Sequence, residues 1–196
     1  MNLQKKVLYE LGEEYIKEKG KMWLKVVSPS MTPLIQINDK VLVESIKCDE
    51  ISLGDIIVFK GNDSPFITHR VIARRKVNDE FHFFEKGDRS VTGTWIHEKS
   101  IIARVIAIKK RDDNSVVLLT DNKRNKFINK LYTMYLLCSY IFEKIIRIIK
   151  NWAKGYKTLT FLREPYRYSY KIITKGQNLS KKVFVFMFIK GMRLYG

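Results

Sequence analysis

The first segment of the chain carries hydrophobic side chains at a helical period. Between residues 2 and 19 they recur every three or four positions among Lys and Glu, as Leu3, Val7, Leu8, Leu11, Tyr15 and Ile16. This period places them on one face of a helix, and Gly20 just beyond them favours its end. We therefore predict an N-terminal amphipathic helix and assign residues 1–21 to it.

The hydrophobic pattern changes in residues 22–120. Short apolar runs rich in Val, Ile and Phe alternate there with turn sequences such as SLGD and KGDRS; the runs are WLKVV, KVLVESI, DIIVFK, FITHRVIARR, FHFFEK, IIARVIAIKK and SVVLL. Runs of this composition between Gly, Asn, Asp and Ser are typical of antiparallel strands. The pattern predicts a mainly β domain built as a coiled β-sheet or a barrel.

A second helical pattern begins in residues 121–196. Apolar side chains follow a period of three or four on one face, at Leu131, Met134, Tyr135, Cys138, Ile141, Phe142, Ile145, Ile146, Ile149 and Trp152, and basic side chains dominate the other. The longest apolar run, LYTMYLLCSYIF, has 12 residues. A bilayer span needs roughly 20. The pattern therefore favours an amphipathic helix in the plane of a membrane, followed by a basic tail whose fold the pattern does not define.

The charge of the chain indicates an anionic partner. There are 37 Lys and Arg against 20 Asp and Glu, a net charge of +17, and residues 127–196 hold 14 basic residues but only 2 acidic ones. The mixture of Lys, Arg and Tyr in REPYRYSYK would also suit contacts with nucleic acid. The broad apolar face of the neighbouring helix favours an anionic membrane surface over nucleic acid as the partner.

The histidines and cysteines give no sign of a metal or a cofactor. Cys48 and Cys138 lie far apart and form no C-x-x-C pair, and His82 and His97 have no partners at metal-ligand spacing. The first 27 residues contain no apolar stretch of the length that a signal sequence requires. We expect no metal, no cofactor and a reducing compartment.

Two hydroxyls stand between prolines and apolar residues in VVSPSMTPLI, residues 26–35. If Ser30 is a nucleophile, it needs a base and donors for an oxyanion. His69 is a candidate base, Asp88 could hold its imidazole in the useful tautomer, and Ser28 could donate to the oxyanion beside the Ser30 backbone N–H. Spacing alone leaves the alternatives open, namely a simple turn, an ordinary histidine on a sheet and a hairpin corner.

Five segments taken in order resemble the successive boxes of the signal peptidase I family: SPSMTPLI, GDIIVFK, THRVIARR, FFEKGD and ARVIAI, within residues 22–109. The resemblance implies a signal-peptidase or LexA-like β fold, Ser30 as the nucleophile and Ser28 as an oxyanion donor. It also implies that Met31 and Pro33 line the substrate cleft, although Met31 could instead pack into the barrel.

The box that reads THRVI carries lysine in the common bacterial form of the family, so His69 is similar to the base of the Ser-His branch. KGD matches the box that supplies an acidic residue, which implies an orienting role for Asp88. That branch usually has another Asp shortly afterwards, and RSVTGTWIH contains none. The acidic support for His69 therefore rests on Asp88 alone or comes from elsewhere.

The expected function is that of a serine endopeptidase that cleaves leader or signal peptides from precursors. We expect it to be membrane-associated through its C-terminal region, with a cytoplasmic catalytic part. One alternative is a LexA-like self-cleaving regulator, but such proteins use a lysine base and a DNA-binding domain that 27 residues before Ser28 could not hold. Another is a non-enzymatic basic module that binds membranes or nucleic acid.

Overall fold

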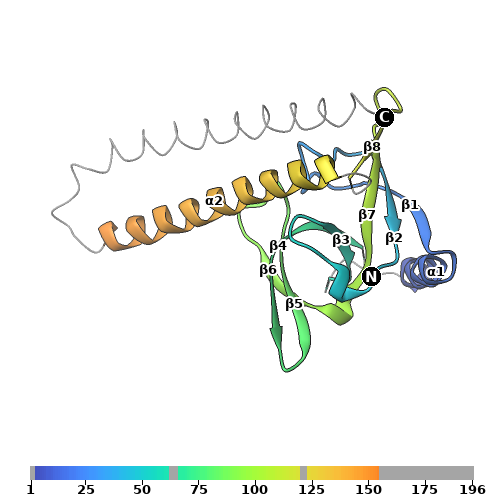
Figure 1. Ribbon diagram of the computed structural model, residues 1–196, viewed down its shortest axis with the longest axis horizontal. Helices are drawn as coiled ribbons and strands as arrows, with labels where there is room; N and C mark the ends of the chain where they lie inside the picture. The colour runs from blue at the N-terminus through green and yellow to red at the C-terminus, as the bar shows by residue number, and fades with distance from the viewer. Residues whose placement is uncertain (1–2, 62–65, 120–122, 155–196) are drawn as a thin grey trace.

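One antiparallel sheet of eight strands forms the centre of the molecule in the computed structural model, which describes residues 3–61, 66–119 and 123–154 (Figure 1). The elements in chain order are α1 (Leu3–Lys19), β1 (Lys21–Lys25), β2 (Lys40–Glu44), η1 (Cys48–Glu50), β3 (Ile56–Phe59), β4 (Ile67–Val77), β5 (Glu80–Lys86), β6 (Thr94–His97), η2 (Glu98–Ser100), β7 (Ile101–Lys109), β8 (Val116–Leu118) and α2 (Lys123–Lys154). The predicted mainly β domain with an N-terminal and a C-terminal helix is confirmed.

The strands follow the order β1-β2-β7-β3-β4-β5-β6, and β8 pairs with β7. β1 and β6 thus form the two edges of the sheet. β6 has only four residues, TWIH, and the first two of them are exposed. Its apolar run was therefore too short for the hydrophobic pattern to predict a strand. The other strands match the predicted runs within a few residues.

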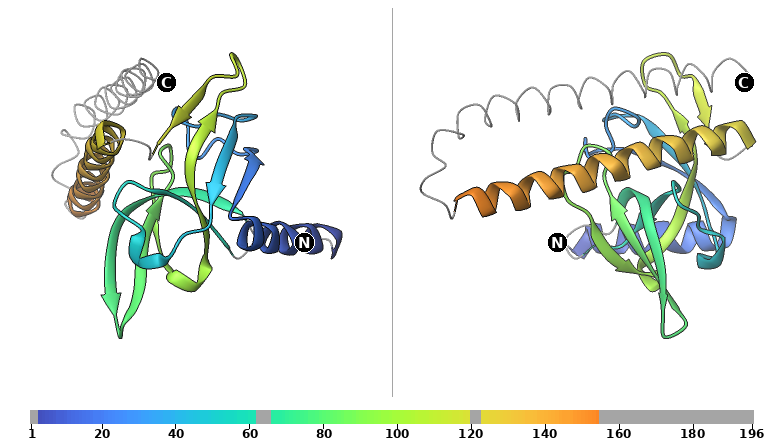
Figure 2. Two further views of the ribbon diagram at one scale, coloured as in Figure 1. Left: turned by 45° about the vertical axis from the view of Figure 1, so that its right-hand side comes forward. Right: turned by 60° about the vertical axis from the view of Figure 1, so that its left-hand side comes forward.

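The larger hydrophobic core joins the sheet to both helices and to the turn after β1. Ile16 of α1, Leu34 of the turn, and Tyr132 and Leu136 of α2 are all at most 1% exposed within this core. The helices lie on different sides of the sheet (Figure 2). The first half of α2 packs into the same core as the strands. The helix that follows the expected boundary at residue 120 therefore shares the core of the β domain.

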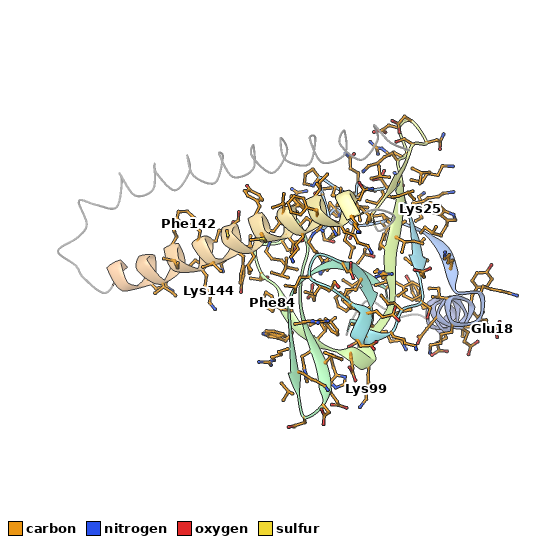
Figure 3. The ribbon with its side chains drawn as sticks, viewed as in Figure 1. Glu18, Lys25, Phe84, Lys99, Phe142 and Lys144 are labelled. Atoms are coloured by element: carbon orange, nitrogen blue, oxygen red, sulfur yellow. The ribbon has the colours of Figure 1, made fainter. Side chains whose placement is uncertain are left out.

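α2 turns a face of mixed apolar and polar side chains toward the sheet and a largely apolar stripe away from it. Its buried residues are Asn125, Asn129, Tyr132, Thr133, Leu136 and Ser139. Its exposed large hydrophobic residues are Phe127, Leu131, Met134, Ile141, Phe142, Ile145 and Ile148, which we call the outer stripe. Figure 3 shows Phe142 and Lys144 on the half of α2 that extends past the strands. Within the described part of the chain, no helix combines the length and the hydrophobicity that crossing a membrane would require.

Candidate active site

Ser28 and Ser30 lie in the turn that connects β1 to β2. Their Oγ atoms are 3.3 Å apart, within hydrogen-bond distance of each other. The turn closes through Thr32, whose backbone N–H and Oγ1 donate to the Pro29 carbonyl at 3.1 and 2.7 Å. Leu34 is buried in the core just beyond it. The turn is thereby held at the surface, with Ser28 exposed and Ser30 partly buried.

Met31, which follows Ser30, is only 2% exposed and belongs to the large core cluster. The structure therefore does not place Met31 in a substrate cleft. It shows the alternative, in which Met31 packs inside the β domain. The physical reason is that the second half of the turn folds onto the domain, so that Met31 is buried together with Leu34 and Ile35. Pro33 is partly buried, and the Thr32–Pro33 peptide bond is cis.

His69 lies on β4, where it pairs with Ile57 of β3. Its Nδ1 atom makes a short contact with the carboxylate of Glu85 on β5. The side chains are well shielded from water, with exposed fractions of 17% for His69 and 9% for Glu85. A carboxylate at Nδ1 fixes the tautomer in which Nε2 is free to accept a proton, and it stabilises the imidazolium that then forms.

Asp88 is fully buried, and its carboxylate pairs with Arg70 and not with His69 Nδ1. Its two carboxylate oxygens accept hydrogen bonds from Nε and Nη2 of Arg70 at 2.9 and 3.0 Å. Burial by itself lowers the pKa of Arg70, but the charge of Asp88 and its hydrogen bonds raise it above the ordinary value. The expected pairing of Asp88 with the imidazole is thus corrected: Glu85 occupies that position, and Asp88 neutralises the adjacent residue on β4.

A loop that begins at Gly87 brings the serine turn and the histidine together. The backbone N–H of Arg89 donates to the Ser30 carbonyl at 2.9 Å. A Cβ atom added to Gly87 would lie 2.8 Å from that carbonyl oxygen and 3.0 Å from His69 Nε2. Both groups therefore touch the same glycine, and His69 presents Nε2, the nitrogen opposite Glu85, toward the serine turn.

The described side chains of Ser30 and His69 make no direct hydrogen bond, since the Ser30 hydroxyl is paired with Ser28. Catalytic hydrogen bonds are often long in enzymes without substrate and tighten when the substrate binds. The site as it stands offers a hydroxyl on a tight turn, an imidazole oriented by a carboxylate, and a second hydroxyl beside the first. These are the groups that serine-dependent acyl transfer uses.

Sequence reasoning missed Glu85, and also Asn129 of α2, which contacts Arg70 from the far side of β4. Glu85 stands in the FFEKGD segment that was already recognised, three residues before Asp88. Strand alternation indicates only that Glu85 and Asp88 point to opposite faces, because they are three residues apart, and not which of them lies beside His69. In the described residues no group of three or more His, Cys, Asp or Glu side chains is arranged to hold a metal ion.

Comparison with known proteins finds a similarity to one group of proteins over about half of the chain. The chain is 28% identical over 114 residues to the signal peptidase complex catalytic subunit SEC11C of Homo sapiens, and equally so to the proteins of that name from Mus musculus and Canis lupus familiaris. The alignment covers 52% of this chain and 59% of each relative, so the chain spans somewhat over half the length of the curated relatives it matches. No protein-family profile matches the chain. The similarity supports a signal peptidase I-like family.

Proposed function

We propose that this protein is a serine endopeptidase of the signal-peptidase type, of the Ser-His branch, that cleaves leader or signal peptides from their precursors. The observation that carries the proposal is the convergence at Gly87 of the Ser30 turn and of His69, whose opposite nitrogen is held by Glu85. The similarity to SEC11C supports the same class of reaction.

In the proposed reaction, Ser30 Oγ attacks the carbonyl carbon of the scissile peptide bond while His69 Nε2 accepts the hydroxyl proton. Glu85 holds the Nδ1–H and stabilises the positive charge on the ring. The oxyanion of the tetrahedral intermediate accepts hydrogen bonds from the Ser30 backbone N–H and the Ser28 hydroxyl. His69 then gives its proton to the leaving amine, and a water molecule activated by His69 hydrolyses the acyl ester on Ser30.

The sheet offers an edge along which a substrate could lie. β1 pairs with β2 on one side and forms an edge of the sheet on the other, and the chain runs from β1 directly into the Ser30 turn. A peptide in extended form can add to such an edge through main-chain hydrogen bonds. We propose that the precursor binds in this way, with small side chains before the cleaved bond, as the resemblance to signal peptidases implies.

α2 supplies the proposed attachment to an anionic membrane surface, with the catalytic part on the cytoplasmic side. Its outer stripe carries seven exposed large hydrophobic residues, and its sequence contains eight Lys and Arg but a single acidic residue, Glu143. A helix with an apolar face and basic flanks binds at the boundary between headgroups and acyl chains. Each well-placed Lys or Arg adds about 1 kcal/mol at an anionic surface.

The proposed function is tested with a fluorescent leader peptide that has Ala at the positions before the expected cleavage site. We expect Ser30→Ala and His69→Ala to remove cleavage, and Ser28→Ala to lower kcat about 10²- to 10³-fold through loss of an oxyanion donor. Ser52→Ala, which removes an exposed hydroxyl in the turn before β3, is the matched control and should cleave as the wild type does. Undiminished cleavage by Ser30→Ala would rule out the proposed reaction.

A further inference from the structure

A buried polar network connects α2 to the strand that carries His69. The side-chain amide of Asn129 accepts a hydrogen bond from Arg70 Nη1 through Oδ1, and it donates from Nδ2 to the Gly54 carbonyl at 2.9 Å. The same carbonyl accepts a hydrogen bond from Arg70 Nη1, also at 2.9 Å. Asn129 is 7% exposed and Arg70 is 0% exposed. The network is therefore almost sealed from water.

Asn129 completes the surroundings of the Arg70 guanidinium. Asp88 binds Nε and Nη2, while Asn129 and Gly54 share Nη1. The ring of Tyr132, which follows Asn129 on the same helix, lies under the guanidinium at 4.9 Å. A buried guanidinium keeps its orientation only when its donors are satisfied. α2 thus fixes the position of Arg70 from one side, and Asp88 fixes it from the other.

The position of Arg70 determines the position of the loop that joins Ser30 to His69. Arg70 follows His69 on β4 and holds Asp88 by two hydrogen bonds. Asp88 stands between Gly87, which touches His69 Nε2, and Arg89, whose N–H binds the Ser30 carbonyl. A shift of the guanidinium would move Asp88, and with it the contacts that set the separation of Ser30 and His69.

We propose that Asn129 is a positioning residue for the active site: through Arg70 and Asp88 it holds the Gly87–Arg89 loop at the separation of Ser30 and His69 that proton transfer requires. The proposal rests on the proposed peptidase function for its kinetic consequence. It makes α2 a part of the catalytic unit and not only a membrane attachment. Proton transfer is sensitive to small displacements, so the loss should appear in kcat more than in KM.

Asn125 provides a matched control one helical turn before Asn129. It is 5% exposed, lies on the same face of α2, and donates from Nδ2 to the Leu118 carbonyl at 2.9 Å. Asn125→Leu and Asn129→Leu therefore both replace a buried amide that binds a backbone carbonyl. Only the second substitution touches the Arg70 network.

The experiment compares Asn129→Leu, Asn129→Ala and Asn125→Leu in the full chain, with kcat and KM measured on the fluorescent leader peptide. We expect both Asn129 variants to lower kcat about 10- to 100-fold with little change in KM, and Asn125→Leu to leave kcat unchanged. Asn129→Asp keeps an acceptor for Arg70 Nη1 and should recover most of the kcat that Asn129→Ala loses. Equal kcat values for Asn129→Ala and the wild type would overturn the proposal.

Amide hydrogen exchange at Arg89 gives a second measurement that needs no catalysis. Its N–H is the donor to the Ser30 carbonyl, so loosening of the loop should raise its exchange rate at least about tenfold in Asn129→Ala and not in Asn125→Leu. Unchanged exchange in Asn129→Ala would also overturn the proposal. If the wild type cleaves no peptide, the proposed function fails, while the exchange at Arg89 still decides whether Asn129 holds the loop.

Discussion

The carboxylate of Glu85 contacts Nδ1 of His69 across two neighbouring strands. In the ladder between β4 and β5, Glu85 pairs with Val71, so it lies diagonally opposite His69 on the same face of the sheet. Arg70 and Asp88 make the corresponding contact on the opposite face. His69 and Arg70 are neighbours on β4, and each pairs with an acidic residue on an opposite face of the sheet. The His69 pair faces the serine turn, and the Arg70 pair faces α2.

This arrangement predicts that Glu85 and Asp88 affect cleavage in different ways. Glu85→Gln removes the charge that stabilises the imidazolium and can hold the ring in the wrong tautomer, so we expect kcat to fall about 10³- to 10⁴-fold. The fold should be kept, because Gln has nearly the same shape. The measurement is steady-state cleavage of the leader peptide, with circular dichroism to check the fold.

Asp88→Asn is the companion variant. It leaves the buried Arg70 charge without its counter-ion, for which the typical cost is about 3–5 kcal/mol of unfolding free energy. In urea denaturation, Asp88→Asn should therefore lower the free energy of unfolding more than Glu85→Gln does. Full activity of Glu85→Gln combined with loss of activity in a stably folded Asp88→Asn would contradict the assignment of Glu85 to His69.

The sequence could predict an acidic residue near His69, but it could not decide which one. β4 and β5 are joined by a two-residue turn at Asn78 and Asp79, both of which have positive φ. Such a turn sets the register of a hairpin. Counting back along both strands from this turn places His69 opposite Asp88, which is the pairing that the sequence predicted.

The register shifts by one residue between Val71 and Ala73, and this irregularity changes which acidic residue lies beside His69. A shift of one residue exchanges the two faces of a strand. It brings Glu85 to the side of His69 and sends Asp88 to the side of Arg70. The run VIARR carries no Gly or Pro that would indicate such an irregularity, so the hydrophobic pattern alone could not reveal it.

α2 illustrates the same limit in a helix. Its existence followed from a strong hydrophobic period, yet half of the apolar face that the period defined lies in the outer stripe, which the sheet does not cover. The face that packs on the domain includes Asn129, because its partners are the buried Arg70 guanidinium and the Gly54 carbonyl. Those partners lie far away in sequence, so no local pattern identifies the inner face.

Gly87→Ala should disable the site without removing any of the proposed catalytic groups. The added methyl would lie 2.8 Å from the Ser30 carbonyl oxygen, 3.0 Å from His69 Nε2 and 2.5 Å from Ser90 Oγ. The serine turn and the imidazole must then move apart, and we expect kcat to fall about 100-fold. The measurement is leader-peptide cleavage alongside a thermal unfolding curve.

Gly12→Ala in α1 is the control for that substitution. Among the residues that the structure describes, the new methyl would meet only the Phe66 ring, at 3.3 Å and more, and alanine favours a helix. Its activity should match the wild type. If Gly87→Ala also retained wild-type activity, Ser30 and His69 would not depend on this glycine for their approach.

Lowering the pH should break up a hydrogen-bonded ion cluster at the edge of the sheet near β6. Glu80 accepts from Lys99 Nζ at 2.6 Å and contacts His97 Nε2 at 2.8 Å, and these hydrogen bonds lower the pKa of Glu80 to about 2 from 4.5. A carboxyl whose folded pKa is lowered contributes stability that is fully present above the unfolded value. That contribution is lost as the pH falls from 4.5 toward 2.

An NMR titration of the Glu80 side-chain carboxyl measures this directly, and the midpoint should lie near 2. Lys99→Met removes the partner whose hydrogen bond lowers the pKa most, so the midpoint should rise toward the ordinary value for Glu. A wild-type midpoint close to 4.5 would show that Glu80 does not hold these two partners in solution.

The outer stripe of α2 is expected to bind anionic vesicles. Ile141, Ile145 and Ile148 are 47%, 48% and 60% exposed and recur at helical spacing on one side. Replacing all three by Gln removes apolar area that would enter the lipid, and we expect binding to phosphatidylglycerol vesicles to weaken at least tenfold at about 25 cal/mol per Å². The measurement is co-sedimentation of the full chain with vesicles.

The control for the stripe variant replaces two exposed valines elsewhere, Val77 and Val116, by Gln, and it should bind as the wild type does because these residues lie outside α2. Binding should also fall in phosphatidylcholine vesicles and at high salt, since the basic side chains of α2 contribute electrostatically. Wild-type sedimentation of the stripe variant would exclude this face as the membrane contact. Equal binding to both lipids would show instead that the charge of α2 contributes nothing to the attachment.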